Sequence, residues 1–448
     1  MSLKPHTSAA LNRIQPSATL AMTARVTKLK ADGVDVIGLS AGEPDFDTPD
    51  FVKEAAIEAI RGGQTKYTLV DGTVALKEAI RGKFRRDNGL DFGLDQITVN
   101  VGGKHTLFNA LVATVDPGDE VIIPAPYWVS YPDIVAFAGG TPVTIEASAA
   151  QNYKITPEQL DAAITAKTRW IIFNSPSNPS GAAYSPEELD ALGEVIRRHP
   201  HVMVMTDDMY EHVWYADFAF STLAQRCPDL IDRILTVNGC SKAYAMTGWR
   251  IGYAGGPAWL IKAMGKLQSQ STSNPCSVAQ AAAVAALGGP QPFLEERNAA
   301  FRKRRDMVVA PGSRRGLLCL SRRERLHGQD DPRRQADRQR RSADRLFPRH
   351  RARRGGAWRG LRSVASLPRF LCDVGGGAQG SVHPHPAGLR RAALTAAPDR
   401  RRLNDAPSSG SPDSKPSSLW VMAVTARRHG ARHIVAVTEG ASPAKTTI

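Results

Sequence analysis

Short apolar runs alternate with amphipathic, helix-like segments along most of this chain, and this alternation strongly constrains the fold. Four of the runs are VIIPA at 121–125, WIIF at 170–173, VMVM at 202–205 and ILTV at 234–237. Strands that alternate with helices favour an α/β fold, in which helices cover both faces of one sheet. Ligand sites in such sheets gather at the carboxyl ends of the strands. We therefore expect the polar residues that follow these runs to form a functional site.

The segment VNGCSKAYAMTGWR at 237–250 places a lysine just after one such strand and an arginine eight residues later. A partly desolvated lysine at a strand end can lose its proton and attack a carbonyl carbon. The planar guanidinium of Arg250 suits a phosphate. A lone lysine is ordinarily a solvated surface group. Lys242 together with Arg250 instead suggests a phosphorylated aldehyde that is bound as an imine.

A second anion-binding feature lies in VGGKHTLFNAL at 101–111, which reads as a strand, a glycine turn and a helix. The backbone N–H groups of Gly103 and Lys104 would open this helix. A helix N-terminus without bulky side chains is a ready phosphate site. We expect Lys104 to contribute its amide group rather than its ammonium group.

Composition sets broad limits on what the chain can be. Its 448 residues carry a formal net charge of +15 and are 42% hydrophobic, which fits about two or three globular domains. We expect no membrane span and no signal peptide, since no suitable apolar run is present. The five cysteines lack metal-type spacing, which favours free thiols in a reducing, cytoplasmic compartment.

The positive charge invites a nucleic-acid interpretation, but its distribution weakens that interpretation. Residues 1–300 mix both signs, and the excess lies mainly in 303–402. Neither a helix-turn-helix nor an aromatic-basic module is apparent. We therefore expect no nucleic-acid partner. A basic regulator fused to an enzyme-like domain remains the alternative from another functional class.

The segment SKAYAMTGWRIGY at 241–253 resembles the lysine segment of class I aminotransferases, the aspartate-aminotransferase-like group of pyridoxal-phosphate enzymes. NPSG at 178–181 and TDDMY at 206–210 match further motifs of that group, and the resemblance covers about residues 10–310. It implies PLP fold type I, which is a three-layer αβα large domain with a mainly parallel sheet, plus a small domain that is incomplete here. It also implies a homodimer whose sites are shared across the interface.

The resemblance implies that pyridoxal 5′-phosphate is the cofactor and that an amino group moves between an amino acid and a 2-oxo acid. An aspartate-like donor is expected. Lys242 would hold the cofactor and move a proton, while Asp207 would pair with the pyridine nitrogen and make the ring an electron sink. The three-residue spacing to Tyr210 favours Asp207 over Asp208. Tyr210 and Asn178 would both donate to the ring oxygen.

The resemblance assigns the remaining contacts to residues in loops. Trp128 would stack on the cofactor ring and shield it from water. Ser241 would bind the phosphate together with Arg250 and the amides at 103–104. Tyr67 would reach the phosphate of the neighbouring subunit. Gly42 would lie beside the substrate carboxylate, where Trp128 and Asn178 also contribute. No metal site is expected.

The match to the family stops near Ala310. The family continues with a Pro-Glu-Gly-Ala-Phe-Tyr-type strand and later a Phe-Arg-x-Ser-Tyr segment, whose arginine grips the substrate α-carboxylate; both are missing. Suitable codons for SRRGLLCLS (313–321), GGAWRGLRSVAS (355–366) and ASLPRFLCDV (365–374), read one base later, would encode three family segments in order. We therefore hypothesise that the chain beyond about 310 is an out-of-frame translation.

These patterns divide the chain into four parts. Residues 1–48 are an N-terminal arm and small-domain segment, 49–290 are the large cofactor-binding domain, and 291–310 are a bridging helix. Residues 311–448 are expected to be a largely disordered, Arg-rich tail, because few apolar residues are there to offset the entropy of ordering. Two functional alternatives stay open: a lyase or decarboxylase with the same cofactor, and an inactive product of a frameshifted gene.

Overall fold

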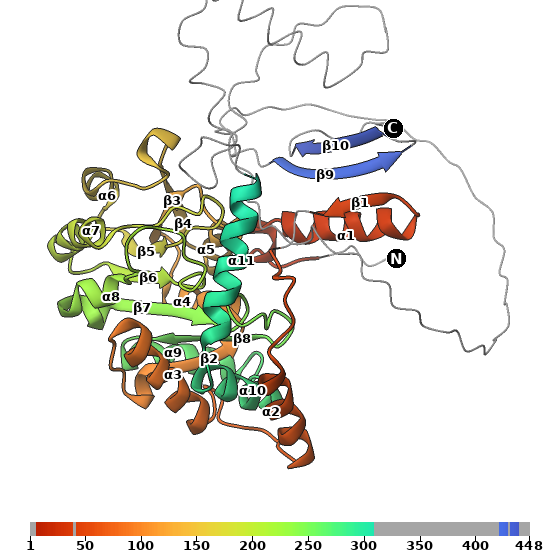
Figure 1. Cartoon of the computed structure of the whole chain (residues 1–448). Helices are drawn as coiled ribbons and strands as arrows, with labels where there is room; N and C mark the ends of the chain where they lie inside the picture. The colour runs from red at the N-terminus through yellow and green to blue at the C-terminus, as the bar shows by residue number, and fades with distance from the viewer. Residues whose placement is uncertain (1–5, 39–41, 309–420, 429–430, 439–448) are drawn as a thin grey trace, which may run out of the picture.

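A seven-stranded sheet forms the centre of the protein. The computed structural model describes residues 6–38, 42–308, 421–428 and 431–438 (Figure 1). The strand order is β2-β8-β7-β6-β5-β3-β4. The strands are β2 (Ile97–Val101), β3 (Glu120–Ala125), β4 (Thr141–Glu146), β5 (Thr168–Asn174), β6 (Met203–Asp207), β7 (Ile234–Gly239) and β8 (Ile251–Gly255). Strand β8 runs opposite to the other six strands of this sheet. The predicted mainly parallel α/β sheet is therefore confirmed.

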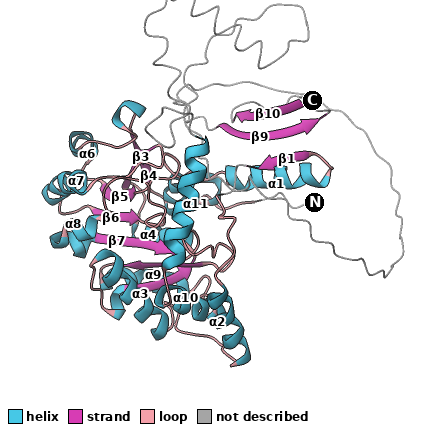
Figure 2. Ribbon diagram, viewed as in Figure 1, coloured by secondary structure: helices cyan, strands magenta, loops and turns pink. Residues whose placement is uncertain are grey.

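Helices cover both faces of this sheet, as Figure 2 shows. One face packs against α4 (Gly103–Thr114), α5 (Ser130–Ala138) and α9 (Ala258–Ser269). The other face packs against α2 (Asp50–Arg61), α3 (Val74–Asn88), α6 (Pro157–Ala163), α7 (Pro186–Arg198), α8 (Leu223–Arg226) and α10 (Ser277–Gly288). Successive strand residues point to opposite faces. Trp170 and Ile172 of β5 therefore join one core, and Ile171 and Phe173 join the other.

Local sequence signals place several helix boundaries. Helix α7 begins after Ser185, whose Oγ accepts from the N–H of Glu188, while the N–H of Ser185 donates to Glu188 Oε2. This reciprocal capping box satisfies two backbone donors that the helix itself leaves unpaired. Helices α9 and α10 are separated at residues 270–276, where the sequence STSNP predicts a break.

A second, smaller sheet involves the N-terminal segment. Helix α1 (Ala18–Ala31) leads to β1 (Asp35–Gly38), which pairs antiparallel with β9 (Val421–Arg428), and β9 pairs antiparallel with β10 (Ala431–Thr438). The sequence predicts a largely disordered tail, and the structure has these two strands within it. The three segments that suggest a frame change lie in 313–374, outside the described residues. The domain boundaries stay predictions.

Helix α11 (Pro292–Val308) is the last helix of the described part of the chain, where a helix is predicted to bridge toward a small domain. In Figure 1 it crosses the front of the large sheet. Its Arg297 donates to the carbonyls of Ala243 and Asp47 at 3.3 and 2.6 Å, so α11 holds the segment after Lys242 next to the strand-to-helix connection at 42–49. None of the helices in the described residues is long and apolar enough to span a bilayer.

Candidate active site

A cavity of about 300 Å³ opens at the carboxyl edge of the large sheet, beyond the ends of β5, β6 and β7. Ten of the eleven predicted site residues line it: Gly42, Gly103, Lys104, Trp128, Asn178, Asp207, Tyr210, Ser241, Lys242 and Arg250. Tyr67 does not line it and is 92% exposed. Ten residues that the sequence predicts thus lie together at the edge of the sheet, and the chemical role of each stays a prediction.

Lys242 lies in the turn after β7 and is half-buried. Its Nζ donates a hydrogen bond to the carbonyl oxygen of Gly42, which brings the loop before α2 to the mouth of the site. The positive charge of Lys242 also acts to lower the pKa of Asp207. The amine thus lies in the same cavity as the carboxylate that ends the neighbouring strand.

Asp207 ends β6 and is only 7% exposed. The hydroxyl of Tyr131 donates to its Oδ2 at 2.7 Å, and the N–H of Met209 donates to its Oδ1 at 3.3 Å. Burial raises the pKa of the Asp207 carboxyl, and these donors and Lys242 act in the opposite direction. Burial disfavours the ionised form of this carboxyl. A cation bound in the cavity would therefore stabilise the carboxylate and lower its pKa.

Tyr210 lies three residues beyond Asp207 and is almost fully buried. Burial, and then the charge of Asp207, raise the pKa of the Tyr210 phenol, while a hydrogen bond with Asn178 lowers it. The net shift is upward, so the phenol stays protonated at neutral pH and can act as a hydrogen-bond donor. The segment that carries Asn178 is held by Asn174, whose Oδ1 accepts from the Asn178 N–H at 2.7 Å.

The start of α4 and the side chain of Arg250 form a cradle for an anion. Gly102 precedes the helix with φ 85°. A Cβ atom on Gly102 would lie 2.2 Å from Nη2 of Arg250, so a larger residue would push the guanidinium out of its present position. Nη1 of Arg250 donates to the Thr247 carbonyl at 2.8 Å. The backbone donors of a helix N-terminus and a guanidinium therefore converge on one place, which suits a phosphate.

Trp128 and Lys104 form another wall of the cavity. Nζ of Lys104 lies 4.8 Å from the Trp128 ring centroid, and the Trp128 ring meets Tyr131 edge to face with centroids 5.4 Å apart. Desolvation, and then the charge of Arg250, lower the pKa of Lys104. The amide of Lys104 opens α4 as predicted, but its ammonium also lies at the cavity.

Sequence reasoning missed two residues that hold the site together. Tyr131, which donates to Asp207, lies in the first turn of α5, three residues after Trp128. Asn174 ends β5, and its Nδ2 donates to the Asp207 carbonyl at 2.7 Å. The strand-end rule that selects Asp207 applies equally to Asn174 and could have found it. Tyr131 gives no such signal, since its partner is 76 residues away.

Comparison with known proteins places the chain in a family. The profile of "Aminotransferase class I and II" matches residues 34–322. The aspartate/prephenate aminotransferase of Cereibacter sphaeroides is 62% identical over 310 residues, which cover 69% of this chain and 78% of that protein. The aspartate aminotransferase of Rhizobium meliloti is 59% identical over 299 residues, 67% of this chain and 73% of that protein.

Solved structures agree with these relatives. The crystal structure of the Rhizobium meliloti aspartate aminotransferase has a TM-score of 0.66 at 57% identity and covers 69% of this chain and 76% of that one. The Thermus thermophilus aspartate aminotransferase with maleate has a TM-score of 0.66 at 44% identity and covers 68% and 80%. The chain is therefore a transaminase that belongs to the class I and II aminotransferases, a generally pyridoxal-phosphate-dependent family.

Proposed function

We propose that this transaminase binds pyridoxal 5′-phosphate through Lys242 and transfers an amino group from aspartate to a 2-oxo acid, with prephenate as one acceptor. The observation that carries the proposal is the meeting of Lys242, Asp207, Tyr210 and Arg250 in one cavity. The choice of aspartate and prephenate rests on the names of the relatives at 62% and 59% identity.

The residues present fit this cofactor. Its phosphate suits the cradle of α4 and Arg250, where a Cβ at Gly102 would fill the space. Its ring nitrogen, when protonated, would be a cationic partner for the buried Asp207 carboxylate, whose pKa is raised by burial. When bound, the cofactor supplies the electron sink that makes the substrate α-proton removable.

The side chains of the chain would then divide the work. Lys242 Nζ would take the proton from the substrate α-carbon and return it on the product side, as general base and acid. The Gly42 carbonyl, which accepts from Nζ, would orient this amine. Tyr131 and the Met209 N–H would keep the Asp207 carboxylate fixed, and Trp128 would exclude water from one side.

We also propose that the enzyme is a cytoplasmic homodimer. Tyr67 is 92% exposed, and Leu69 and Val74 nearby in the chain are 58% and 55% exposed. Such a group of large exposed side chains favours an interface, because apolar surface is costly to leave in water. In this arrangement Tyr67 would reach the phosphate that is held by the partner subunit.

The part of the family site that grips the substrate is a separate matter. Among the described residues, Arg250 is the only arginine that lines the cavity, and our proposal uses it for the phosphate. The family profile ends at residue 322, which supports the proposal that the sequence beyond about 310 is read out of frame. Cofactor binding and transamination should therefore be tested separately.

The test begins with an absorption spectrum of the purified chain with pyridoxal phosphate, before and after borohydride. Lys242→Ala should abolish the band that borohydride fixes, while Lys262→Ala, at an exposed position on α9, should leave it unchanged. Conversion of aspartate with prephenate or another 2-oxo acid is then measured. A chain without a lysine-dependent band would refute the proposed site.

A further inference from the structure

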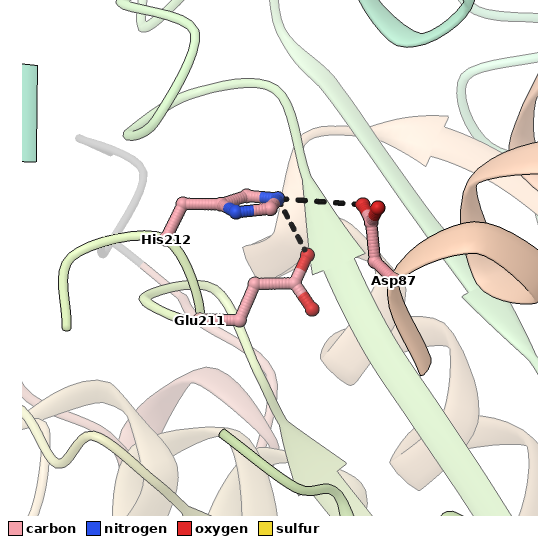
Figure 3. Close-up of side chains that lie close together, drawn as sticks. All are labelled: Asp87, Glu211 and His212. Carbon is pink, nitrogen blue, oxygen red and sulfur yellow. Dashed lines mark ion pairs between the residues drawn. The ribbon is translucent and has the colours of Figure 1, made fainter. Parts of the chain in front are cut away.

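Three charged side chains, Asp87, Glu211 and His212, lie close together (Figure 3), and none of them lines the cavity. Nε2 of His212 is 3.5 Å from Oδ2 of Asp87 and 3.3 Å from Oε1 of Glu211. These three residues have the donor atoms of a metal site. However, the ammonium of the fully buried Lys83 forms an ion pair with Glu211 Oε1 and lies 3.8 Å from Asp87 Oδ2. Lys83 thus already supplies a cation, and the cluster is better explained without a metal.

Glu211 is the centre of this cluster, because each of its carboxylate oxygens has its own amide donor. Nδ2 of Asn238 donates to Oε1 at 2.9 Å, and Nδ2 of Asn88 donates to Oε2 at 3.0 Å. Lys83 Nζ in turn donates to Asn88 Oδ1 at 2.7 Å. A buried charge is tolerated only when it is paired and its hydrogen bonds are satisfied, and Glu211 meets both conditions.

The charges of the cluster balance one another at neutral pH. Burial opposes ionisation of Glu211, but the charges of Lys83 and His212 outweigh it and lower the Glu211 pKa. Burial also opposes protonation of His212, but Glu211 and Asp87 outweigh it and raise the His212 pKa to about 9. Two cations therefore face two carboxylates, with Lys83 and Glu211 buried and Asp87 and His212 partly buried.

The cluster also connects two turns of the proposed site, because of where Glu211 lies in the chain. Glu211 directly follows Tyr210, and Asn238 lies in β7, four residues before Lys242. Strands β6 and β7 are neighbours, and Asp207 is opposite Val237. The Glu211–Asn238 hydrogen bond therefore joins the turn that carries Tyr210 to β7, the strand that leads into the Lys242 turn. The Glu211–Asn88 bond joins the same carboxylate to α3, which supplies no residue to the cavity.

We propose that Glu211 and Asn238 are positioning residues that fix the Tyr210 turn relative to the Lys242 turn. This inference rests on the proposed cofactor site. It assigns a function to a hydrogen bond that crosses between two strand ends, and it treats Lys83, Asp87 and His212 as the groups that make the buried carboxylate tolerable.

Two substitutions test the inference, since each removes one amide donor from the same carboxylate. Each also removes one acceptor, which is that of the Gly239 N–H in Asn238→Ala and that of Lys83 Nζ in Asn88→Ala. Asn238→Ala and Asn88→Ala should both lower the urea midpoint of unfolding. Only Asn238→Ala should raise the dissociation constant for pyridoxal phosphate, on the order of 10-fold, and Asn88→Ala should change it less than about twofold. Equal losses of affinity in the two variants would overturn the inference. Asn238→Ser keeps a short polar side chain and replaces Asn238→Ala if that variant does not fold.

Hydrogen exchange of the chain without cofactor gives a second, independent measurement. Asn238→Ala should speed amide exchange in both 208–212 and 240–243, whereas Asn88→Ala should leave 240–243 protected. Gly239 is left out of the comparison because its N–H donates to Asn238 Oδ1 directly. Faster exchange confined to one of the two turns would contradict the inference. If the unsubstituted chain fails to bind pyridoxal phosphate, the proposed function fails, and the exchange measurement still decides whether the two turns are joined through Glu211.

Discussion

Residues up to 308 and residues from 311 onward differ in what they share with the relatives. The first region contains the complete sheet and the cavity, and the relatives align with about 69% of the chain. The family profile ends at residue 322, so most of the second region lies beyond it, and the sequence there is predicted to lack the segment that the resemblance assigns to the substrate carboxylate. If the proposed site and the proposed frame change are both right, this chain should bind its cofactor and its substrate through regions that can be tested separately.

The largest expected effect comes from restoring the family reading frame after about residue 310. We expect transamination of aspartate to rise by about 100-fold or more, since a bidentate arginine on the substrate carboxylate is among the strong charge-assisted contacts. The affinity for pyridoxal phosphate should change less than about threefold. Steady-state kinetics and a cofactor titration check this. A large gain in cofactor affinity would show that the two regions are not separable.

Gly102→Ala should damage the cofactor region alone. Its Cβ would meet the Arg250 guanidinium at 2.2 Å, and its φ of +85° is unfavourable for alanine, so pyridoxal phosphate should bind about 10- to 100-fold more weakly. Gly118→Ala is the matched control, because Gly118 has φ +102° with no neighbour within 4 Å. Fluorescence titration with the cofactor measures both variants. Equal weakening in the two would mean that backbone strain, rather than the cradle, sets the affinity.

Tyr131→Phe should change the pH dependence of the enzyme. The Tyr131 hydroxyl lowers the Asp207 pKa against the opposing effect of burial, so its loss should raise that pKa further. The acidic limb of the activity profile should then move to higher pH, with activity about 10-fold lower on that limb. Tyr184→Phe removes another buried phenol that does not line the cavity and should leave the profile in place. A limb that stays or moves to lower pH would contradict this role.

Asp208→Asn should act on stability and leave the cofactor region unchanged. Burial raises the Asp208 pKa well above 3.8, so the wild-type carboxyl contributes stability at low pH that is lost as pH rises through its folded-state pKa. The asparagine variant should therefore be more stable at pH 8, by about 1–3 kcal/mol, and this gain should shrink toward pH 4. Urea unfolding at both pH values measures the difference. A gain that is larger at pH 4 would have the wrong sign.

The sequence predicts those parts of the site that follow a local rule. The residues that follow an apolar run come to the sheet edge, and the spacing to Tyr210 selects Asp207, which lines the cavity, over Asp208, which does not. The contacts of Tyr131 and Glu211 depend instead on partners 76 and 123 residues away. Such contacts follow from strand register and helix packing, which no local pattern specifies. The role of Tyr67 needs a second subunit and stays a prediction.

The cradle of Gly102 and Arg250 has a consequence for how the protein folds. Its two halves lie beside β2 and β8, which pair with Val101 opposite Ile251, and all of β3 to β7 lies between them in the chain. Closing so long a loop is slow, because its entropy must be lost before the contact is gained. A nascent chain that has folded the turn around Lys242 but has not yet paired β2 with β8 would still lack the complete cradle. An anion at this cradle, such as the cofactor phosphate of our proposal, would therefore stabilise only a chain in which β2 and β8 are already paired, and it would favour folding by trapping that late step.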